Sequence, residues 1–161
     1  MKYYPIYISL EGKSCIVIGG GEVGERKVLR LLECGAQVTV VAEAITPALM
    51  TLRDEGRIRC IPGAYESGHV AGAFLVIGAT DRDDVNGRIA KDCRSRGVMV
   101  NIVDDPNRCD FILPSLFEQG DLSIAVSTSG KSPALAKRIR QELGSQYGGE
   151  YAVLLRIMGA L

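Results

Sequence analysis

Three glycines have the spacing of a loop that holds a phosphate-bearing ligand. Gly19, Gly21 and Gly24 fit the pattern G-x-G-x-x-G and follow the short apolar run 15–18. The first glycine permits a tight turn, the second lets a pyrophosphate approach the backbone, and the third lets a helix pack closely on a strand. A helix that begins at such a turn offers unpaired N–H groups to phosphates. Glycine is abundant here (19 of 161 residues), so the context must support this dinucleotide-binding interpretation.

An acidic residue lies where the ribose of such a ligand would be held. A second apolar run, 37–41, follows the helix predicted after the glycines, and Glu43 comes just beyond it. A carboxylate about 20 residues past the glycine turn accepts hydrogen bonds from the ribose hydroxyls of NAD and repels the 2′-phosphate of NADP. We therefore expect NAD as the cofactor. The alternative is a structural β-α-β unit that binds no ligand.

Small residues follow a later apolar run, 73–80. Gly78 and Ala79 precede Thr80 and Asp81 at the end of this predicted strand. Ligands of doubly wound sheets bind at the carboxyl ends of the strands, and small residues there would let a nicotinamide ribose pass. We expect Thr80 and Asp81 to contact the cofactor. Asp81 has the alternative role of capping the helix that follows.

Two adjacent carboxylates end the next predicted strand, 98–103. Asp104 and Asp105 precede Pro106. A carboxylate beside a nicotinamide is a candidate for proton transfer, because a neighbouring like charge raises its pKa towards the useful range. Asp104 is preferred, since the strand delivers it directly to the carboxyl edge of the sheet. An Asp-Pro turn that merely ends the strand is an equally good interpretation of composition alone.

A loop rich in hydroxyl groups precedes the last long amphipathic segment. It resembles the end of a phosphate-binding P-loop, but Ala125 stands where that motif requires glycine. Hydroxyl groups at a helix N-terminus suit the carboxylates of a substrate, and the alternative is a plain helix cap. The candidate substrate-binding residues of this loop are Ser127, Thr128, Ser129, Lys131 and Ser132.

The elements that position these groups alternate between strand and helix. The expected strands are 5–10 (a short edge strand), 15–18, 37–41, 58–61, 73–80 and 98–103, with helices after Gly24 and over 46–56 and 81–96. This order predicts an α/β fold with a Rossmann-like doubly wound parallel sheet. From residue 110 two short apolar runs indicate a hairpin, and a helix begins at 132–133, followed by a short apolar tail.

We therefore expect two parts: residues 1–113 as an NAD-binding Rossmann domain and residues 114–161 as a small α+β dimerisation unit. The apolar faces of residues 114–145 are too small to form a core of their own, so we expect them to pack against a second copy of the chain in a homodimer.

Composition narrows the classes of function. Hydrophobic residues make up 47% and charged residues 24%, and 19 basic residues balance 19 acidic ones, so no net charge attracts nucleic acid or a membrane surface. The five cysteines are widely spaced without a metal-ligand pattern and are expected to be reduced thiols. No bound metal, leader peptide or membrane span is expected, and the expected location is the cytoplasm.

Four segments closely resemble the precorrin-2 dehydrogenase/sirohydrochlorin ferrochelatase family of siroheme synthesis. In chain order they are GGGEVGERKVLRLLECGAQVTVVA, GATDRDDVN, NIVDDPNRCDFILPS and STSGKSPALAKRIR, and the similarity runs from Tyr4 to Leu143. The resemblance implies a homodimer with an intertwined dimerisation region that oxidises precorrin-2 to sirohydrochlorin with NAD. Many members of the family also insert ferrous iron, as a second substrate, into sirohydrochlorin, and the resemblance extends this expectation to the present chain.

Carried over by position, the resemblance assigns individual roles. Glu22, Val23, Glu43 and Ala44 would contact NAD, and Asp104 would be the catalytic carboxylate. Asn101 and the hydroxyl loop would lie beside the tetrapyrrole. Family members commonly have alanine where Gly24 stands, an exchange expected to be harmless. They usually continue past residue 161 into a helical segment, which bears on substrate closure and on iron insertion.

Two other classes of protein would share the glycine turn. One is a non-catalytic NAD-binding regulatory module, and the other is a structural dimeric Rossmann domain. The regulatory module has no need of Asp104 together with a hydroxyl-rich, basic loop, so the residues after position 100 discriminate it from the enzyme. The structural domain is tested by whether NAD raises the melting temperature.

Overall fold

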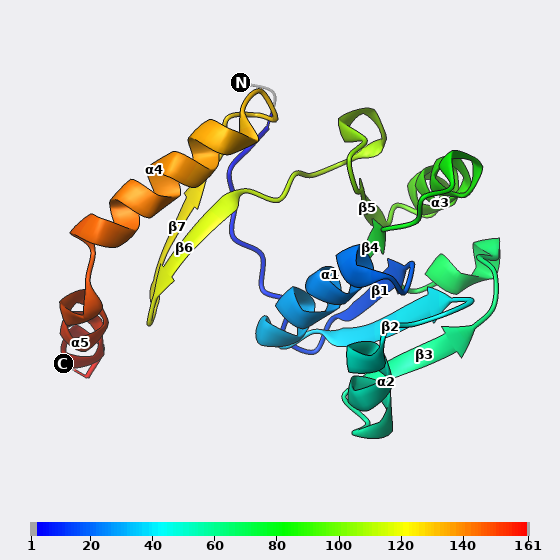
Figure 1. The fold of residues 1–161 in the computed structure, drawn as a ribbon, viewed down its shortest axis with the longest axis horizontal. Helices are drawn as coiled ribbons and strands as arrows, with labels where there is room; N and C mark the ends of the chain where they lie inside the picture. The colour runs from blue at the N-terminus through cyan, green and yellow to red at the C-terminus, as the bar shows by residue number, and fades with distance from the viewer. Residues whose placement is uncertain (1–2, 161) are drawn as a thin grey trace. The chain divides into compact units, whose positions relative to one another are not determined.

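The computed structural model describes residues 3–160 and divides into two compact units (Figure 1). One unit comprises residues 5–111, and the other comprises residues 112–160 together with residues 3–4. No helix within 3–160 is long and apolar enough to cross a membrane.

The unit 5–111 is built on a five-stranded parallel sheet. In chain order the strands are β1 (Ser14–Ile18), β2 (Gln37–Ala42), β3 (Ile58–Pro62), β4 (Leu75–Gly78) and β5 (Met99–Ile102). Their order across the sheet is β3-β2-β1-β4-β5, which is the Rossmann order and confirms the predicted fold class. All four residues of β4 are buried, as expected for a parallel strand covered on both faces.

Helices cover both faces of this sheet. They are α1 (Glu22–Glu33), α2 (Pro47–Asp54) and α3 (Asp83–Ser95). Two short 3₁₀ helices are also present: η1 (Ser67–Val70) lies between β3 and β4, and η2 (Pro106–Arg108) follows β5. The predicted start of α2 is present, because Thr46 Oγ1 accepts a hydrogen bond from Leu49 N at 3.3 Å and Pro47 is the first helical residue. Proline suits that position because its missing N–H would have no partner there.

Two apolar clusters form the core, one on each face of the sheet. Ile16 and Ile18 of β1 enter one cluster with residues of α3, whereas Cys15 and Val17 enter the other with residues of α1 and α2. The alternation follows from the two-residue period of a strand. Helix α3 therefore covers one face, and helices α1 and α2 cover the opposite face.

The prediction of an edge strand over 5–10 is wrong. The structure has no strand in that stretch, and Tyr4, Ile6 and Tyr7 are exposed. The chain is instead held just beyond it, where Gly12 N donates a hydrogen bond to Gly35 O at 2.9 Å. Apolar residues alone predicted the strand, but the edges of the sheet are β3 and β5, and this segment does not join either of them as a strand.

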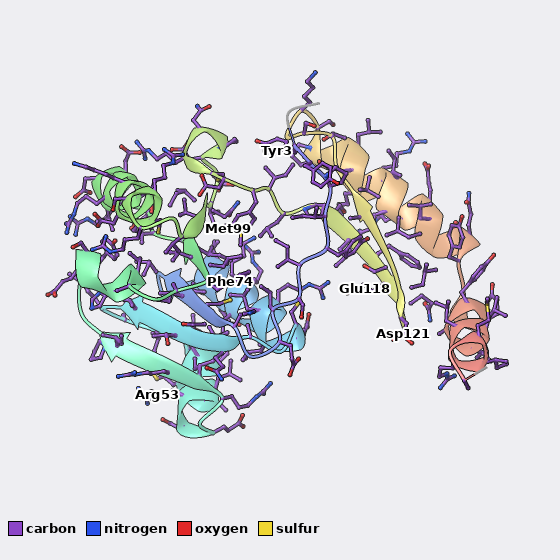
Figure 2. The ribbon with its side chains drawn as sticks, turned by 180° about the vertical axis from the view of Figure 1, so that it is seen from behind. Tyr3, Arg53, Phe74, Met99, Glu118 and Asp121 are labelled. Atoms are coloured by element: carbon purple, nitrogen blue, oxygen red, sulfur yellow. The ribbon has the colours of Figure 1, made fainter. Side chains whose placement is uncertain are left out.

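The unit 112–160 contains a hairpin and two helices. Strands β6 (Ser115–Gln119) and β7 (Leu122–Val126) pair antiparallel, as predicted, and Asp121 lies at the tip of their turn (Figure 2). Helix α4 (Pro133–Gln146) packs on both strands. Helix α5 (Gly149–Met158) was expected only as an apolar tail. Among the described residues of this unit, Ala136 alone is buried.

Candidate functional site

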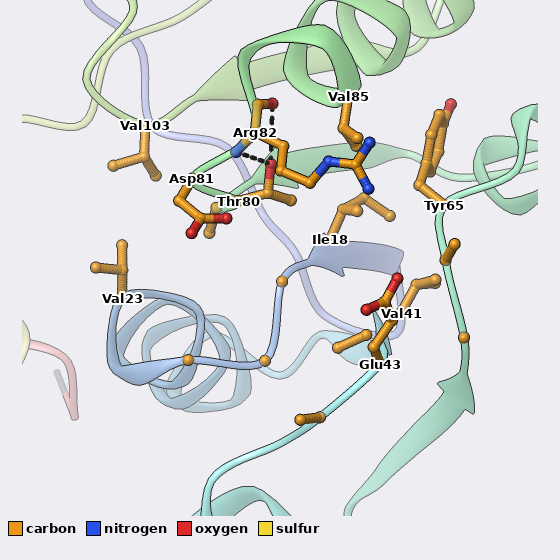
Figure 3. A pocket seen from close by; sticks show the side chains of 18 of the residues that line it. Ile18, Val23, Val41, Glu43, Tyr65, Thr80, Asp81, Arg82, Val85 and Val103 are labelled. Carbon is orange, nitrogen blue, oxygen red and sulfur yellow. Dashed lines mark hydrogen bonds between the residues drawn. The ribbon is translucent and has the colours of Figure 1, made fainter.

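A pocket of about 780 Å³ lies at the carboxyl edge of the parallel sheet (Figure 3). Its wall comes from the turns that follow β1, β2, β4 and β5, together with the loop after β3 and one side of α3. Strands β2 and β4 lie on opposite sides of β1, so the chain reverses direction across the sheet at this point. Such a switch point is where doubly wound sheets bind ligands.

Most residues expected to bind the cofactor meet in this pocket. Eight of the nine expected cofactor residues line it, and Asp104 lines it as well; the eight are Gly19, Gly21, Glu22, Val23, Glu43, Ala44, Thr80 and Asp81. The ninth, Gly24, lies in the first turn of α1 and packs against the backbone instead.

The glycines of the turn have different surroundings. Gly19 has φ +118°, and a Cβ there would overlap the carbonyl oxygen of Ala79. Gly21 has an ordinary φ of −79°, and a Cβ there would meet nothing within 4 Å. The open space at Gly21 is what close approach of a pyrophosphate requires, whereas Gly19 is required by the packing of two backbones.

Gly24 is the third glycine, and the expectation that alanine would be harmless there is wrong for this backbone. A Cβ at Gly24 would overlap the carbonyl oxygen of Gly19 and lie 3.0 Å from its carbonyl carbon. Both atoms are backbone atoms and cannot rotate away. The close packing of α1 on the end of β1 therefore depends on the missing side chain.

The N-terminus of α1 faces the pocket without a side-chain cap. Gly21 is the N-cap residue and offers no side-chain acceptor, and within the described residues no other side chain caps this helix. The first N–H groups of a helix have no intrahelical partner, and they carry the positive end of the helix dipole. This end of α1 can therefore hold an anion such as a pyrophosphate.

Glu43 follows the last residue of β2 and points into the pocket (Figure 3). Arg82 lies across the pocket from it and forms an ion pair with Asp84 at 3.0 Å. Arg88 of α3 also lines the wall. A carboxylate on one side and two arginines on the other can bind the ribose and the adenine face of a dinucleotide.

The two arginines and Tyr65 were not singled out by the sequence interpretation. The guanidinium of Arg88 lies 5.6 Å from the ring centre of Tyr65, and the Tyr65 hydroxyl donates to Asp92 Oδ2 at 2.8 Å. Burial, together with this hydrogen bond, raises the pKa of Tyr65 above its usual value of 10.0. Val85 and Arg88 both line the pocket and are three residues apart on α3, and this spacing is the signal that could have identified Arg88.

The loop after β4 is fixed by side-chain hydrogen bonds. Thr80 Oγ1 accepts from Arg82 N at 3.3 Å (Figure 3). It also donates to Asn86 Oδ1 at 2.8 Å, and Asn86 Nδ2 donates to Thr80 O at 3.0 Å. The alternative role of Asp81 as a helix cap is wrong, because Arg82 is the N-cap residue of α3 and, in the described part of the chain, no side-chain hydrogen bond caps this helix. Asp81 points into the pocket instead.

Asp104 reaches the pocket through a strained turn. Its φ is +61°, a left-handed conformation that few residues other than glycine adopt, and Asp105 N closes the turn by donating to Ile102 O at 3.2 Å. Strained non-glycine residues often cluster at functional sites. Asp105 caps η2, because its Oδ1 accepts from Asn107 N at 3.1 Å. The two adjacent carboxylates are therefore in different settings, Asp104 on the pocket and Asp105 in the turn.

Lys27 of α1 interacts with Asp104 and was not identified from the sequence. Burial and the nearby Arg26 lower the pKa of the Lys27 amine, and the Asp104 carboxylate opposes this shift. Lys27 lies one helical turn after Val23, which lines the pocket. The amine offers Asp104 a positive charge from the neighbouring helix.

Asn101 does not line the pocket. It is buried in β5, and its Nδ2 donates to Phe111 O at 2.9 Å, so it holds the segment after η2 against the strand. The amide has this structural partner, and its role towards a substrate stays a prediction.

The hydroxyl loop belongs to the unit 112–160 and is braced internally. Thr128 Oγ1 accepts from Ser132 N at 3.0 Å, Ser127 Oγ accepts from Ser129 N at 3.1 Å, and Ser132 Oγ caps α4 by accepting from Leu135 N at 3.2 Å. Ser129 has φ +54°, and it shares this left-handed conformation with Asp104 alone among the described non-glycine residues. Ser132 thus fulfils the helix-cap alternative, and Lys131 is exposed.

Across residues 3–160, no three His, Cys, Asp or Glu side chains are grouped so that they could hold a metal ion. The five cysteines are free thiols. Burial raises the pKa of the Cys15 and Cys93 thiols from 9.0 to about 11.

Two family models match the chain. The first, described as putative NAD(P)-binding, matches residues 6–115, and the second, described as sirohaem biosynthesis protein central, matches residues 119–146. The boundary between the two matches lies near the boundary between the two structural units.

Curated relatives and a solved structure give the same picture. Siroheme synthase 1 of Aeromonas salmonicida and siroheme synthase of Photobacterium profundum are each 41% identical over 143 residues, which is 89% of this chain. The chain spans 31% and 30% of their lengths, so it corresponds to about a third of each. A solved structure of SirC, a precorrin-2 dehydrogenase, is 29% identical with a TM-score of 0.85, covering 96% of this chain and 76% of that one.

Proposed function

The chain belongs to the NAD(P)-binding family of siroheme biosynthesis, and on this premise we propose that it oxidises precorrin-2 to sirohydrochlorin with NAD as the hydride acceptor. One observation carries the proposal: the fold brings Asp104 into the same pocket as the glycine turn and Glu43. Dehydrogenation removes a hydride and a proton, so it needs a nicotinamide next to a base. A protein that only binds a dinucleotide has no need of that carboxylate.

The residues of the pocket fit a dinucleotide. The N–H groups at Gly21–Val23 would hold the pyrophosphate, Glu43 and Ala44 the adenosine ribose, and Thr80 and Asp81 the nicotinamide ribose. When bound, NAD supplies the acceptor for the hydride. The chain's own part in the chemistry is to bind the cofactor, to place the substrate carbon against it and to take up the proton at the Asp104 carboxylate.

We propose NAD over NADP because Glu43 occupies the position beside the adenosine ribose. Its carboxylate would accept hydrogen bonds from the ribose hydroxyls and would repel a 2′-phosphate. Arg82 and Arg88 line the same pocket and could attract that phosphate, so the choice depends on Glu43. Titration of the chain with both cofactors tests this, and tighter binding of NADP would contradict it.

The substrate is a polycarboxylate, so its site must supply cations and N–H groups. Lys131, Lys137, Arg138 and Arg140 provide positive charge near the start of α4, where Arg138 pairs with Glu142 at 2.8 Å. Together with the hydroxyl loop, they would hold the carboxylate groups of the tetrapyrrole.

We also propose a homodimer formed through residues 114–145. With Ala136 as the one buried residue described in 112–160, this unit has little core of its own, and Leu135 on α4 is 48% exposed. Sedimentation should therefore give twice 17.3 kDa. A stable monomer at micromolar concentration would contradict the dimer.

The direct test is an assay with precorrin-2 and NAD, following the formation of reduced nicotinamide and of sirohydrochlorin. The matched control is Asp54→Asn, a carboxylate on α2 that pairs only with its neighbour Arg53 within the described residues. We expect this variant to match the wild-type chain and Asp104→Asn to lose the rate. Binding of NAD without any turnover would favour the regulatory module. Ferrous iron added with sirohydrochlorin then tests ferrochelation, which stays a prediction, as does the cytoplasmic location.

A further inference from the structure

On the premise of the dehydrogenase function above, we propose that Arg108 is a positioning residue that fixes the Asp104 turn by joining Asp105 to Asp83. The three residues lie outside the wall of the pocket, yet they connect two of the loops that form it. Their contacts therefore hold the reacting carboxylate in place.

Two loops must keep a fixed separation for the pocket to work. The residues Ala79–Arg82 follow β4, and Val103–Asp104 follow β5. The strands remain paired up to Gly78 and Ile102, and Val103 N donates to Gly78 O at 2.9 Å. Beyond that hydrogen bond, the side chain of Arg108 connects Asp83, which follows the first loop, with Asp105, which follows the second.

The geometry of Arg108 suits a bridge between two carboxylates. Its guanidinium donates to both carboxylate oxygens of Asp83, with Nη2 to Oδ2 at 3.2 Å, and also to Asp83 O at 3.3 Å. Its Nε lies 3.3 Å from Asp105 Oδ2. A planar guanidinium can hold one carboxylate with two parallel bonds and another through Nε, whereas a lysine ammonium cannot reproduce this fork.

Asp105 passes this constraint to the turn. Its Oδ2 meets Arg108, its Oδ1 accepts from Asn107 N, and its own N–H closes the turn that contains Asp104. The thiol of Cys109 supports the same turn, since its Sγ lies 3.2 Å from Ile102 N and O and 3.1 Å from Asp105 O. A left-handed φ is uncommon for a residue other than glycine, and these contacts around the turn hold Asp104 at φ +61°.

The bridge should affect chemistry more than stability. The Arg108 and Asp83 side chains are 30% and 84% exposed, and ion pairs in such settings add little to the folding free energy. A displacement of the reacting group by about 1 Å can reduce a rate by about 100-fold. We therefore expect a fall in kcat of about 10-fold in Arg108→Gln, since the turn stays partly held by Cys109. NAD affinity should stay within about twofold, because Glu43 and the glycine turn are untouched.

The experiment compares four proteins with the wild-type chain: Arg108→Gln, Asp83→Asn, the double variant and Arg108→Lys. Arg53→Gln is the matched control, since it removes an exposed ion pair on α2 that has no link to the pocket. For each we would measure kcat with precorrin-2 and saturating NAD, the NAD dissociation constant and the melting temperature. The double variant should be no slower than either single variant, because the two residues act as one unit. Arg108→Lys should recover less than half of the lost rate, because it restores the charge without the fork.

Amide hydrogen exchange at Asp105 gives a readout that does not depend on the reaction. Loss of the bridge should speed this exchange by about fivefold or more. Unchanged exchange would overturn the proposal whatever the activity, and so would faster exchange with a wild-type kcat, or a kcat loss that merely follows the unfolded fraction. If the wild-type chain forms no sirohydrochlorin, the proposed function fails instead, and the exchange rate still decides whether Arg108 holds the turn.

Discussion

The left-handed backbone at Asp104 allows its carboxylate and its turn to be tested separately. Asparagine and glycine both tolerate a φ of +61°, whereas alanine does not. Asp104→Asn and Asp104→Gly therefore remove the charge and keep the turn, and Asp104→Ala removes both. If the carboxylate takes up the proton, all three variants should lose about 10²- to 10⁴-fold in the rate of sirohydrochlorin formation.

The three variants should differ in stability, although their rate losses should be similar. A non-glycine residue without a helpful polar side chain pays about 1 kcal/mol or more in the left-handed region. For a domain of this size, 1 kcal/mol corresponds to about 2–4 °C in melting temperature. Asp104→Ala should therefore melt about 3 °C below the wild-type chain, while Asp104→Asn and Asp104→Gly should stay within about 1 °C of it.

The assay is the precorrin-2 reaction with NAD, together with thermal unfolding of each variant in the same buffer. Equal rate losses with unequal melting temperatures would assign the chemistry to the carboxylate. If Asp104→Asn and Asp104→Gly kept the wild-type rate and only Asp104→Ala lost it, the residue would be a turn former. The reasoning about proton transfer would then be refuted.

Glu43→Gln should lower the ratio of NAD to NADP affinity by about 10-fold or more, because a charge-assisted bond and a repulsion are both lost; calorimetric titration would show it, and an unchanged ratio would contradict it. Gly24→Ala should lower the unfolding free energy by about 1–3 kcal/mol through overlap with Gly19 O, whereas the open position Gly68 should accept alanine freely; urea unfolding of both variants compares them. Unfolded thiols ionise first on raising the pH, so the unfolding free energy should fall between pH 9.0 and about 11, by about 2 kcal/mol at about pH 10.5 for each of Cys15 and Cys93. Cys93→Ala should lose about 2 kcal/mol less than the wild-type chain between about pH 8 and pH 10.5, and a loss equal to that of the wild-type chain would show that burial does not raise the pKa of this thiol.

The parallel sheet could be predicted because its strands carry their own signal. Runs such as 15–18 and 75–78 are apolar on both faces, and only strands covered by helices on both sides bury such runs. The glycine turn and the acid after β2 are likewise separated by a nearly fixed number of residues. The part of the pocket built from β1, α1 and β2 therefore follows from local spacing.

The rest of the site depends on contacts that no local pattern encodes. Tyr65 comes from the loop after β3 and Arg88 from α3, and they meet because the connection from β3 to β4 packs against α3. The strand predicted over 5–10 is absent for the same reason, since an apolar run becomes a strand only where it can pair with the edge of a sheet. The amide of Asn101, which the family resemblance assigns to the substrate, bonds the backbone of Phe111, and no local pattern predicts this partner; its role towards a substrate stays a prediction.

Gly19 and Gly21 would respond differently to selection, although they belong to one motif. Gly19 is pressed against the carbonyl of Ala79, so any side chain there damages the folded chain whether or not a ligand is present. Gly21 faces open space with a φ that every residue can adopt, so the empty protein should accept many residues at this position. A library of variants screened only for folding should therefore keep Gly19 and lose Gly21. The same library screened for growth that depends on the cofactor should keep both.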